Sequence, residues 1–218
     1  MISLVLLGPP GAGKGTQAER LARDFGLTPI SAGDILRAEV AAGTDLGKIA
    51  GPIIATGAMI PNDLMIEAIE KRISRPDCDQ GVIFDGFPRT EDQAQALTVM
   101  LGKMYRTVSA VIVLQADEAT LVARMNARVF NAVAKGQTPR SDDNIQTFKG
   151  RLDIYKTQSS LTIPYYPSHL VTTIDAMQSI DDVASDMKAA MIARGYKQRV
   201  FSFPPSAPSN PGAGPTPI

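Results

Sequence analysis

The sequence predicts a three-layer α/β sandwich, in which helices cover both faces of a mostly parallel sheet. Two observations carry this prediction. The apolar run Ile2–Leu7 is continuous and short, which is typical of a central strand buried on both faces. Short apolar runs and amphipathic helical segments then alternate along most of the chain, which is the order that parallel strand–helix–strand units produce.

The predicted elements follow one another in a regular order. A helix is expected from Lys14, because Ala18, Leu21, Ala22 and Phe25 then fall on one face. Further strands are predicted over residues 82–84, 108–114 and 170–174. Further helices are predicted over residues 90–104, from about 117 to beyond 128, over 142–160 and over 179–194. The last of these opens on Ser-Ile-Asp-Asp, which resembles a capping box.

The end of the chain has a different composition from the rest. From residue 204 to residue 218, six of fifteen residues are proline and the others are mostly small or polar. Such a segment cannot bury enough apolar surface to offset the entropy lost on ordering. Residues 201–218 are therefore expected to form a disordered, proline-rich tail.

Length and charge exclude several classes of protein. A chain of 218 residues suits one domain with small insertions. Lysine plus arginine number 22, as do aspartate plus glutamate, so the net charge near zero argues against a general nucleic-acid binder. Any anion site must then arise from a local arrangement of side chains. Nothing in the sequence indicates an oligomer seam, and a monomer is expected.

Cysteine usage and hydropathy indicate the compartment. Cys78 is the only cysteine, so one chain can form neither a disulfide framework nor a cysteine-rich zinc site. The N-terminal apolar run lacks a basic flank and is too short for a signal peptide or a membrane span. We expect a cytoplasmic protein with no membrane partner.

The segment Gly8-Pro9-Pro10-Gly11-Ala12-Gly13-Lys14 fits the phosphate-loop pattern GxxxxGK. Its glycines let backbone N–H groups turn toward phosphate oxygens, and the start of the following helix adds partial positive charge. Lys14 can reach a transferred phosphoryl group. Gly15 replaces the usual metal-binding Ser or Thr, so magnesium is expected through water and a carboxylate. Asp85, at the end of a predicted buried strand, is the candidate.

Four segments in order resemble one family. The segment Gly8–Thr16 reads GPPGAGKGT, residues 31–37 resemble STGDxLR, residues 85–93 match DGFPRTxxQ, and residues 140–151 match RxDD…R. Over residues 1–194 the chain is similar to the nucleoside monophosphate kinases and especially to the adenylate kinases. The resemblance implies a five-stranded parallel P-loop core and two mobile subdomains.

The resemblance also divides the chain. It implies a core of residues 1–30, 61–126 and 144–200, a monophosphate-binding subdomain of residues 31–60, and a short lid of residues 127–143. Between Arg128 and Arg140 the lid has no cysteine or histidine, so no structural zinc is expected.

The implied activity is reversible transfer of the γ-phosphoryl of Mg·ATP to AMP, which gives two ADP. The partners are therefore ATP and AMP, with Mg²⁺ as cofactor. The implied catalytic residues are Lys14, Asp85, Arg89, Arg128, Arg140 and Arg151. The implied ATP contacts are Gly11, Ala12, Gly13, Lys14, Gly15, Thr16, Arg124, Arg128 and Gln178. The implied AMP contacts are Ala32, Arg37, Ala58, Met59, Ile60, Gly86, Phe87, Pro88, Arg89, Gln93, Arg140 and Arg151.

Gln93 and Asp34 each have a structural alternative. By resemblance Gln93 reads the adenine of AMP, since its amide can both donate and accept. The segment Thr90-Glu91-Asp92-Gln93 is also a capping box, in which Gln93 serves only the helix start. Asp34 can hold the monophosphate-binding subdomain in place. We favour a role as the N-cap of its helix, because aspartate is a preferred N-cap residue.

Two alternatives stay open, one for the identity of the substrate and one for the activity itself. Ala32 stands where adenylate kinases usually have threonine and UMP/CMP kinases often have alanine, while Thr90 and Gln93 favour AMP. A nucleotide-binding switch or a catalytically silent binding module is the other alternative. A GTPase switch would need an NKxD-type segment, which is absent. A silent module would have lost some of the arginines, Lys14 or Asp85, and all of these are present.

Overall fold

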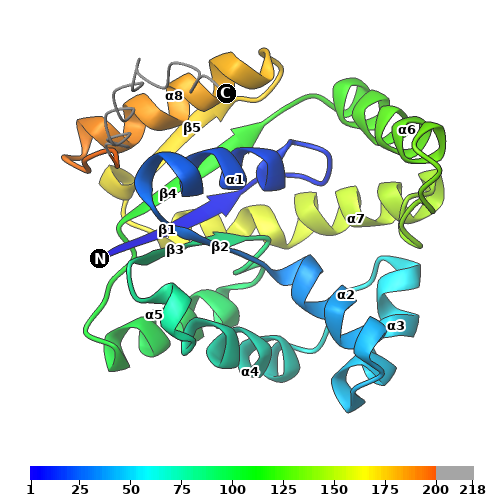
Figure 1. Ribbon diagram of the computed structural model, residues 1–218, viewed down its shortest axis with the longest axis horizontal. Coiled ribbons are helices and arrows are strands. Elements are labelled where there is room, and N and C mark those ends of the chain that lie inside the picture. The colour runs from blue at the N-terminus through cyan, green and yellow to red at the C-terminus, as the bar shows by residue number, and fades with distance from the viewer. Residues whose placement is uncertain (200–218) are drawn as a thin grey trace, which may run out of the picture.

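Five parallel strands form one sheet in the order β2-β3-β1-β4-β5 in the computed structural model, which describes residues 1–199. The strands are β1 Ile2–Leu7, β2 Thr28–Ser31, β3 Gly81–Asp85, β4 Ala110–Gln115 and β5 Val171–Asp175. In the register, Leu4 of β1 lies between Ile83 of β3 and Ala110 of β4. The predicted α/β fold is confirmed (Figure 1). The predicted tail, residues 201–218, lies outside the described residues.

The helices connect these strands and cover the sheet. They are α1 Lys14–Phe25, α2 Ala32–Ala42, α3 Asp45–Thr56, α4 Asn62–Ile73, α5 Glu91–Lys103, α6 Glu118–Ala134, α7 Ile145–Thr157 and α8 Ile180–Ala193. Short 3-10 turns occupy Pro76–Cys78, Ser159–Tyr165 and Ser168–Leu170. Within residues 1–199 no helix combines the length and the apolarity needed to cross a membrane.

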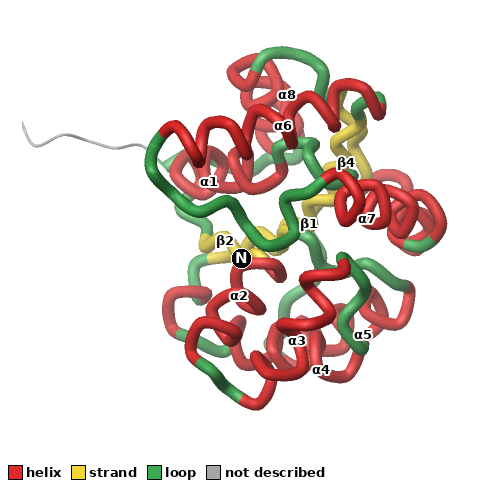
Figure 2. Tube along the Cα trace, turned by 90° about the vertical axis from the view of Figure 1, so that its right-hand side faces the viewer, coloured by secondary structure: helices red, strands yellow, loops and turns green. Residues whose placement is uncertain are grey.

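The alternation of side chains along the central strand separates two hydrophobic cores. Val5 and Leu7 of β1 point into a core shared with α2, α4 and α5. Leu4 and Leu6 point into the opposite core, shared with α1, α6, α7 and α8. Figure 2 shows α1 and α8 on one side of the sheet and α4 and α5 on the other. Both faces of β1 are thus buried, as its continuous apolar run requires.

Side-chain caps define where several helices begin. Thr90 and Ser179 accept hydrogen bonds from backbone N–H groups three residues later, which confirms the two predicted N-caps. The helix predicted over residues 142–160 instead begins at Ile145, because Asn144 caps it. The predicted N-cap role of Asp34 is wrong: Ser31 accepts the capping hydrogen bond from the Asp34 N–H. Asp34 lies inside the first turn and forms an ion pair with Arg37.

The structure contains elements that sequence patterns did not specify. The edge strand β2 is only four residues long and includes Pro29, so it gives no clear alternation. Helices α2 and α3 form a hairpin that extends from the sheet, as Figure 1 shows. Gly47 allows the two helices to cross closely, since a Cβ atom there would lie 2.1 Å from the Glu39 carbonyl oxygen. This α2–α3 hairpin forms one wall of the site described next.

Candidate functional site

The phosphate loop lies where predicted, between β1 and α1. Gly13 precedes the helix in the left-handed region, with φ of 90°, and no side chain caps the helix start. Backbone N–H groups of the first turn are therefore free to meet an anion. The Lys14 ammonium donates hydrogen bonds to the carbonyl oxygens of Gly8 (2.8 Å) and Pro9 (2.9 Å), so it lies folded against its own loop.

Asp85 closes the other side of this loop. It ends β3, the strand beside β1, and its Oδ2 would lie 3.5 Å from a Cβ atom at Gly15. Burial raises the pKa of this carboxyl group, and the positive charge of Lys14 opposes that rise. Burial lowers the pKa of Lys14 to about 8, against the attraction of Asp85. Lys14 and Asp85 are both half-buried, and the charge of each offsets part of the cost of desolvating the other.

Arg89 and Arg151 bring positive charge to the same region from different elements. Arg89 follows β3, and its Nε donates to the Gly86 carbonyl oxygen at 2.8 Å. Burial, followed by the repulsion of Arg151, lowers its pKa to about 10, so it stays charged at neutral pH. Arg151 lies on α7 and forms an ion pair with the buried Asp142. Burial lowers the pKa of Arg151, while Asp142 opposes that change.

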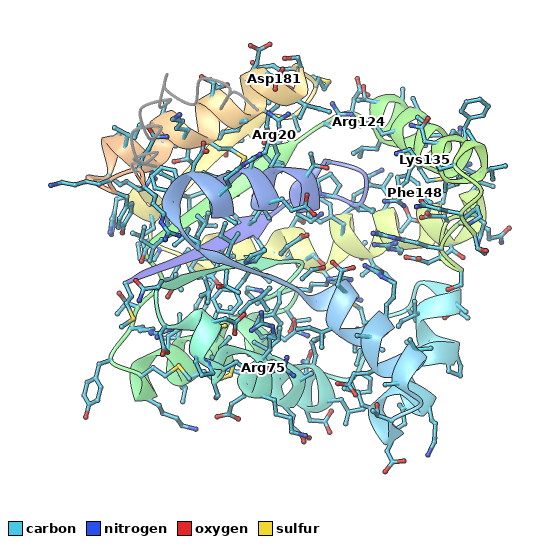
Figure 3. The ribbon with its side chains drawn as sticks, in the orientation of Figure 1. Arg20, Arg75, Arg124, Lys135, Phe148 and Asp181 are labelled. Atoms are coloured by element: carbon cyan, nitrogen blue, oxygen red, sulfur yellow. The ribbon has the colours of Figure 1, made fainter. Side chains whose placement is uncertain are left out.

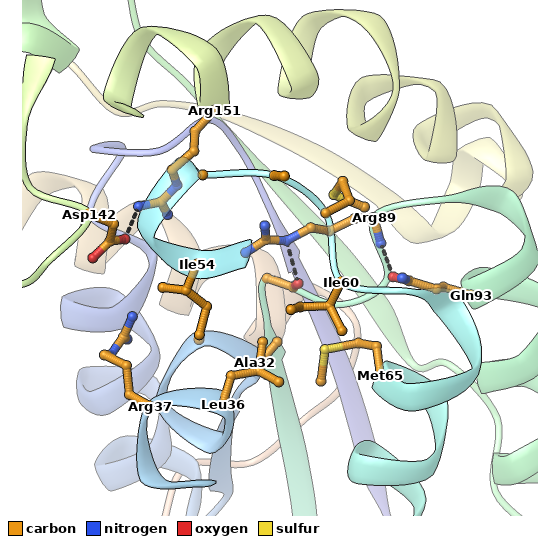
Figure 4. Close-up of a pocket in the computed structure, with 15 residues that line it drawn as sticks. Ala32, Leu36, Arg37, Ile54, Ile60, Met65, Arg89, Gln93, Asp142 and Arg151 are labelled. Carbon is orange, nitrogen blue, oxygen red and sulfur yellow. Dashed lines mark hydrogen bonds and ion pairs between the residues drawn. The ribbon is translucent and has the colours of Figure 1, made fainter. Parts of the chain in front are cut away.

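Two cavities adjoin at these arginines. One has a volume of about 580 Å³ and is lined by the α2–α3 hairpin and the segments after it (Figure 4). The other, of about 510 Å³, is lined by the phosphate loop and α7. Both cavities are lined by Gly57, Gly86, Arg89 and Arg151.

Most of the predicted AMP-site residues line the first cavity. They are Ala32, Arg37, Ala58, Met59, Ile60, Gly86, Arg89, Gln93 and Arg151. Figure 4 shows Arg89, Gln93 and Arg151 directed toward the same space. Pro88 instead lines the second cavity, with Lys14. Phe87 is fully buried and its ring packs against Phe84, so its side chain belongs to the core.

The structure distinguishes in part between the two roles considered for Gln93, base recognition and capping of the helix start. Its backbone N–H does bond to the Thr90 side chain, as in a capping box. Its side-chain Oε1, however, accepts from the Arg89 N–H at 2.8 Å rather than from the N–H of Thr90. The side chain is 1% exposed and lines the first cavity. Gln93 therefore both supports the turn before α5 and faces the cavity.

Other predicted residues lie away from the two cavities. The Arg124 guanidinium, labelled in Figure 3, donates to the Ala176 carbonyl oxygen at 2.6 Å, which links α6 to the segment after β5. Arg128 forms an ion pair with Asp143, which is buried. Arg140 is exposed, and Gln178 donates to Asp186 on α8. Of the phosphate loop, Gly11, Ala12, Gly13, Gly15 and Thr16 line neither cavity.

The cavities also include side chains that sequence reasoning did not identify. Leu36, Ile54 and Met65 give the first cavity an apolar wall, and Tyr155 lies in the second. Helical periodicity marks the three apolar residues as inward-facing, but it cannot distinguish a cavity wall from a packed core. Nothing in the sequence around Tyr155 singles it out.

A parallel sheet that presents a phosphate loop beside two adjoining cavities is the architecture of a P-loop nucleotide kinase. Comparisons with known proteins define the family. The family model for adenylate kinase matches residues 6–171. The chain belongs to the adenylate kinase family, as its motifs predicted.

Curated relatives match over nearly their whole length. The chain is 42% identical over 200 residues to an adenylate kinase of Methylobacterium radiotolerans, covering 91% of this chain and 99% of the relative. It is 42% identical over 199 residues to an adenylate kinase of Nitrobacter winogradskyi, covering 91% and 97%. It is 44% identical over 183 residues to that of Beijerinckia indica, covering 84% and 95%.

Proposed function

We propose that this chain transfers the γ-phosphoryl group of Mg·ATP to AMP and so interconverts ATP plus AMP with two ADP. The observation that carries the proposal is the shared lining of the two cavities by Arg89 and Arg151. One cavity is lined by Gly8, Pro10 and Lys14 of the phosphate loop, which suits the phosphates of ATP. The other has an apolar wall and the amide of Gln93, which suit a purine. The phosphates of the two nucleotides would then meet at the two arginines.

The shared arginines suit the demands of phosphoryl transfer. The reaction needs in-line positioning and neutralisation of charge on the transferring group rather than covalent participation of the protein. Guanidinium groups bind phosphate oxygens in a planar fork and keep their charge. Arg89 would hold the AMP phosphate, and Arg151 would act on the transferring group. Lys14 would leave the loop carbonyls and bind the β- and γ-phosphates.

Magnesium fits the donor set around Asp85. Mg²⁺ is usually bound by one or two carboxylates together with water and substrate phosphates, rather than by a cage of protein ligands. Asp85 offers one carboxylate at the phosphate loop, and Gly15 leaves space beside its Oδ2. Asp85 would hold the ion through water. The ion would neutralise charge that develops on the β- and γ-phosphates.

Closure of two subdomains completes the proposed site. The subdomains are residues 31–60, which contain the α2–α3 hairpin, and the short lid of residues 127–143. Arg140 is exposed and Arg128 is paired with Asp143, so neither reaches the cavities as the chain stands. Closure of the lid would bring both arginines to the phosphates and exclude water, which competes as an acceptor. Arg124 would then lie beside the ATP adenine.

AMP is the acceptor that the first cavity suits best, although Ala32 leaves a pyrimidine acceptor as the second candidate. Ala32 lines the cavity without a hydroxyl group, as expected for a UMP/CMP kinase. Gln93 and the apolar wall of Leu36, Ile54 and Met65 favour a flat purine with a hydrogen-bonding edge. We therefore place AMP first and extend the proposal to a monomeric, cytoplasmic enzyme without nucleic-acid or membrane partners.

A rapid-quench experiment tests direct transfer. The protein is mixed with ATP labelled in the γ-phosphoryl group and with AMP, and the reaction is stopped in denaturant. We expect the label to pass from ATP to ADP within one turnover, with none retained on the denatured protein. A labelled protein that forms with ATP alone and passes its label to AMP would show a covalent intermediate and overturn direct transfer. Absence of any transfer would favour a silent binding module.

A further inference from the structure

A chain of side-chain hydrogen bonds begins at Gln93 in the lining of the first cavity and runs from α5 to α4 and back. The Nε2 of Gln93 donates to the Oδ1 of Asn62 at 2.8 Å. The Nδ2 of Asn62 donates in turn to the Oδ2 of Asp92 at 3.2 Å. At the other end of Gln93, its Oε1 accepts from the Arg89 backbone N–H at 2.8 Å. Figure 4 shows this last bond at the edge of the cavity.

Both ends of this chain have a fixed polarity. A backbone N–H, such as that of Arg89, can only donate, and an ionised carboxylate, such as that of Asp92, can only accept. Thr90 adds a third constraint. Its Oγ1 accepts from the Gln93 N–H at 3.3 Å and donates its own proton to the Oδ1 of Asn62 at 3.3 Å. The oxygen of Asn62 therefore faces Gln93, and the amino group of Gln93 faces Asn62.

We propose that Asn62 is a positioning residue that fixes the amide polarity of Gln93, so that the cavity accepts a 6-aminopurine monophosphate and rejects a 6-oxopurine monophosphate. This inference rests on the proposed function. Gln93 is 1% exposed and lines the cavity, and after its two bonds it retains one N–H and one acceptor position for a base. Those two groups lie in fixed places because the amide cannot rotate freely.

The polarity of the amide decides which purine it can read. Adenine presents an acceptor at N1 and a donor at its 6-amino group. Hypoxanthine has the same shape but presents a donor at N1 and an acceptor at O6. A free glutamine amide could serve either base after a half-turn. In this chain a half-turn would set the Gln93 oxygen against the Asn62 oxygen and the Gln93 amino group against the Arg89 N–H. Buried polar groups left unpaired in this way are costly.

The test compares AMP with IMP as acceptors in three proteins: wild type, Asn62→Leu and Asn62→Asp. In the wild type we expect kcat/KM for AMP to exceed that for IMP by at least about a hundredfold, since buried hydrogen-bonding groups reject a mismatched ligand strongly. Asn62→Leu removes the acceptor, and the AMP-to-IMP ratio should fall by about tenfold or more, the worth of one buried hydrogen bond. Asn62→Asp keeps an acceptor and should retain the wild-type ratio.

The aspartate variant separates this role from a merely structural one. If Asn62 served only to tie α4 to Asp92, a second carboxylate beside Asp92 would repel it, and Asn62→Asp would be at least as harmful as Asn62→Leu. Equal loss of AMP and IMP activity in Asn62→Leu, or loss of the ratio in Asn62→Asp, would overturn the proposal. Asp63→Leu, at the exposed neighbouring position, is the matched control and should leave the ratio unchanged.

The same data keep this inference distinct from the proposed function. Wild-type transfer to AMP tests the proposed function by itself. If the wild type uses AMP well but its AMP-to-IMP ratio does not depend on Asn62, only the positioning role fails. If the wild type does not use AMP, the proposed function fails first.

Discussion

Replacement of Lys14 by methionine should make the nucleotide-free protein more stable while it removes most of the activity. The ammonium lies against the phosphate loop in a half-buried position, and desolvation lowers its pKa from 10.5 to about 8. A folded state that lowers the pKa of a lysine disfavours its charged form. The free protein therefore carries an electrostatic cost at Lys14, which the phosphates of ATP would relieve.

The magnitude follows from the pKa shift and the hydrogen bonds. A shift from 10.5 to about 8 corresponds to roughly 3.5 kcal/mol at neutral pH, at about 1.4 kcal/mol per pKa unit. The substitution also removes two hydrogen bonds to loop carbonyls, each contributing about 1 kcal/mol. The net gain in unfolding free energy is on the order of 1.5 kcal/mol. For a protein of this size, that gain raises Tm by about 3–6 °C.

The stability difference between Lys14→Met and wild type should depend on pH in one direction. The pKa of Lys14 in the folded state, about 8, is below its unfolded value of 10.5. The cost of the charge is therefore fully present below pH 8 and disappears as pH rises from 8 to 10.5. The variant should be more stable at pH 7 and should lose that advantage over this interval.

Thermal unfolding without nucleotide and a coupled assay of ADP formation test both halves of this prediction. Removal of a preorganised positive group at the transferring phosphoryl should lower the rate by at least about a hundredfold. A Tm below that of the wild type at pH 7, or a stability difference that grows between pH 8 and 10.5, would refute the argument from burial. Near-normal activity would refute the role of Lys14.

Three further predictions concern other residues of the site and its walls. Arg89→Ala should lower kcat/KM by at least about a hundredfold. Arg75→Ala, at an exposed position, should stay near wild type in the same assay. Equal losses of kcat/KM in the two variants would exclude a specific role for Arg89. Gly47→Ala should lower the unfolding free energy by about 1–3 kcal/mol, because its Cβ would lie 2.1 Å from a carbonyl oxygen of α2. Gly51→Ala in the same helix meets only Val40 methyl groups at 3.8 Å and should be neutral or stabilising in urea unfolding. Ala32→Thr should raise the ratio of kcat/KM for AMP over CMP by about threefold to tenfold through one added hydrogen bond, and an unchanged ratio would remove Ala32 as a specificity residue.

The parts of the fold that repeat a strong local pattern were predictable from sequence. The apolar run of β1 and the alternation that follows it specify the sheet, and the caps at Thr90 and Ser179 specify two helix starts. The edge strand β2 was missed because only Ile30 of its four residues is buried. Helix α7 begins three residues later than the predicted start, because Asn144 caps it while Asp142 and Asp143 pair with Arg151 and Arg128.

The residues of the candidate site likewise divide into those that the sequence identifies and those that it does not. The phosphate loop, Asp85, Arg89 and Gln93 are recognisable because each lies within a motif of fixed spacing. The apolar wall at Leu36 was not recognisable, since a cavity wall and a packed core have the same periodicity. Asn62 was not recognisable either. Its partners lie 28 to 31 residues away in the sequence, and only the packing of α4 beside α5 brings them together.

Phosphoryl transfer from Mg·ATP to a panel of monophosphates is the decisive test of the proposed activity. The panel contains AMP, dAMP, CMP, UMP and GMP, each measured with the purified 218-residue chain under the same conditions. We expect a clear preference for AMP, with ADP as the product from both nucleotides. A preference for CMP or UMP would contradict the purine site at Gln93, and no transfer to any acceptor would contradict the claim that the two cavities bring two nucleotides together at Arg89 and Arg151.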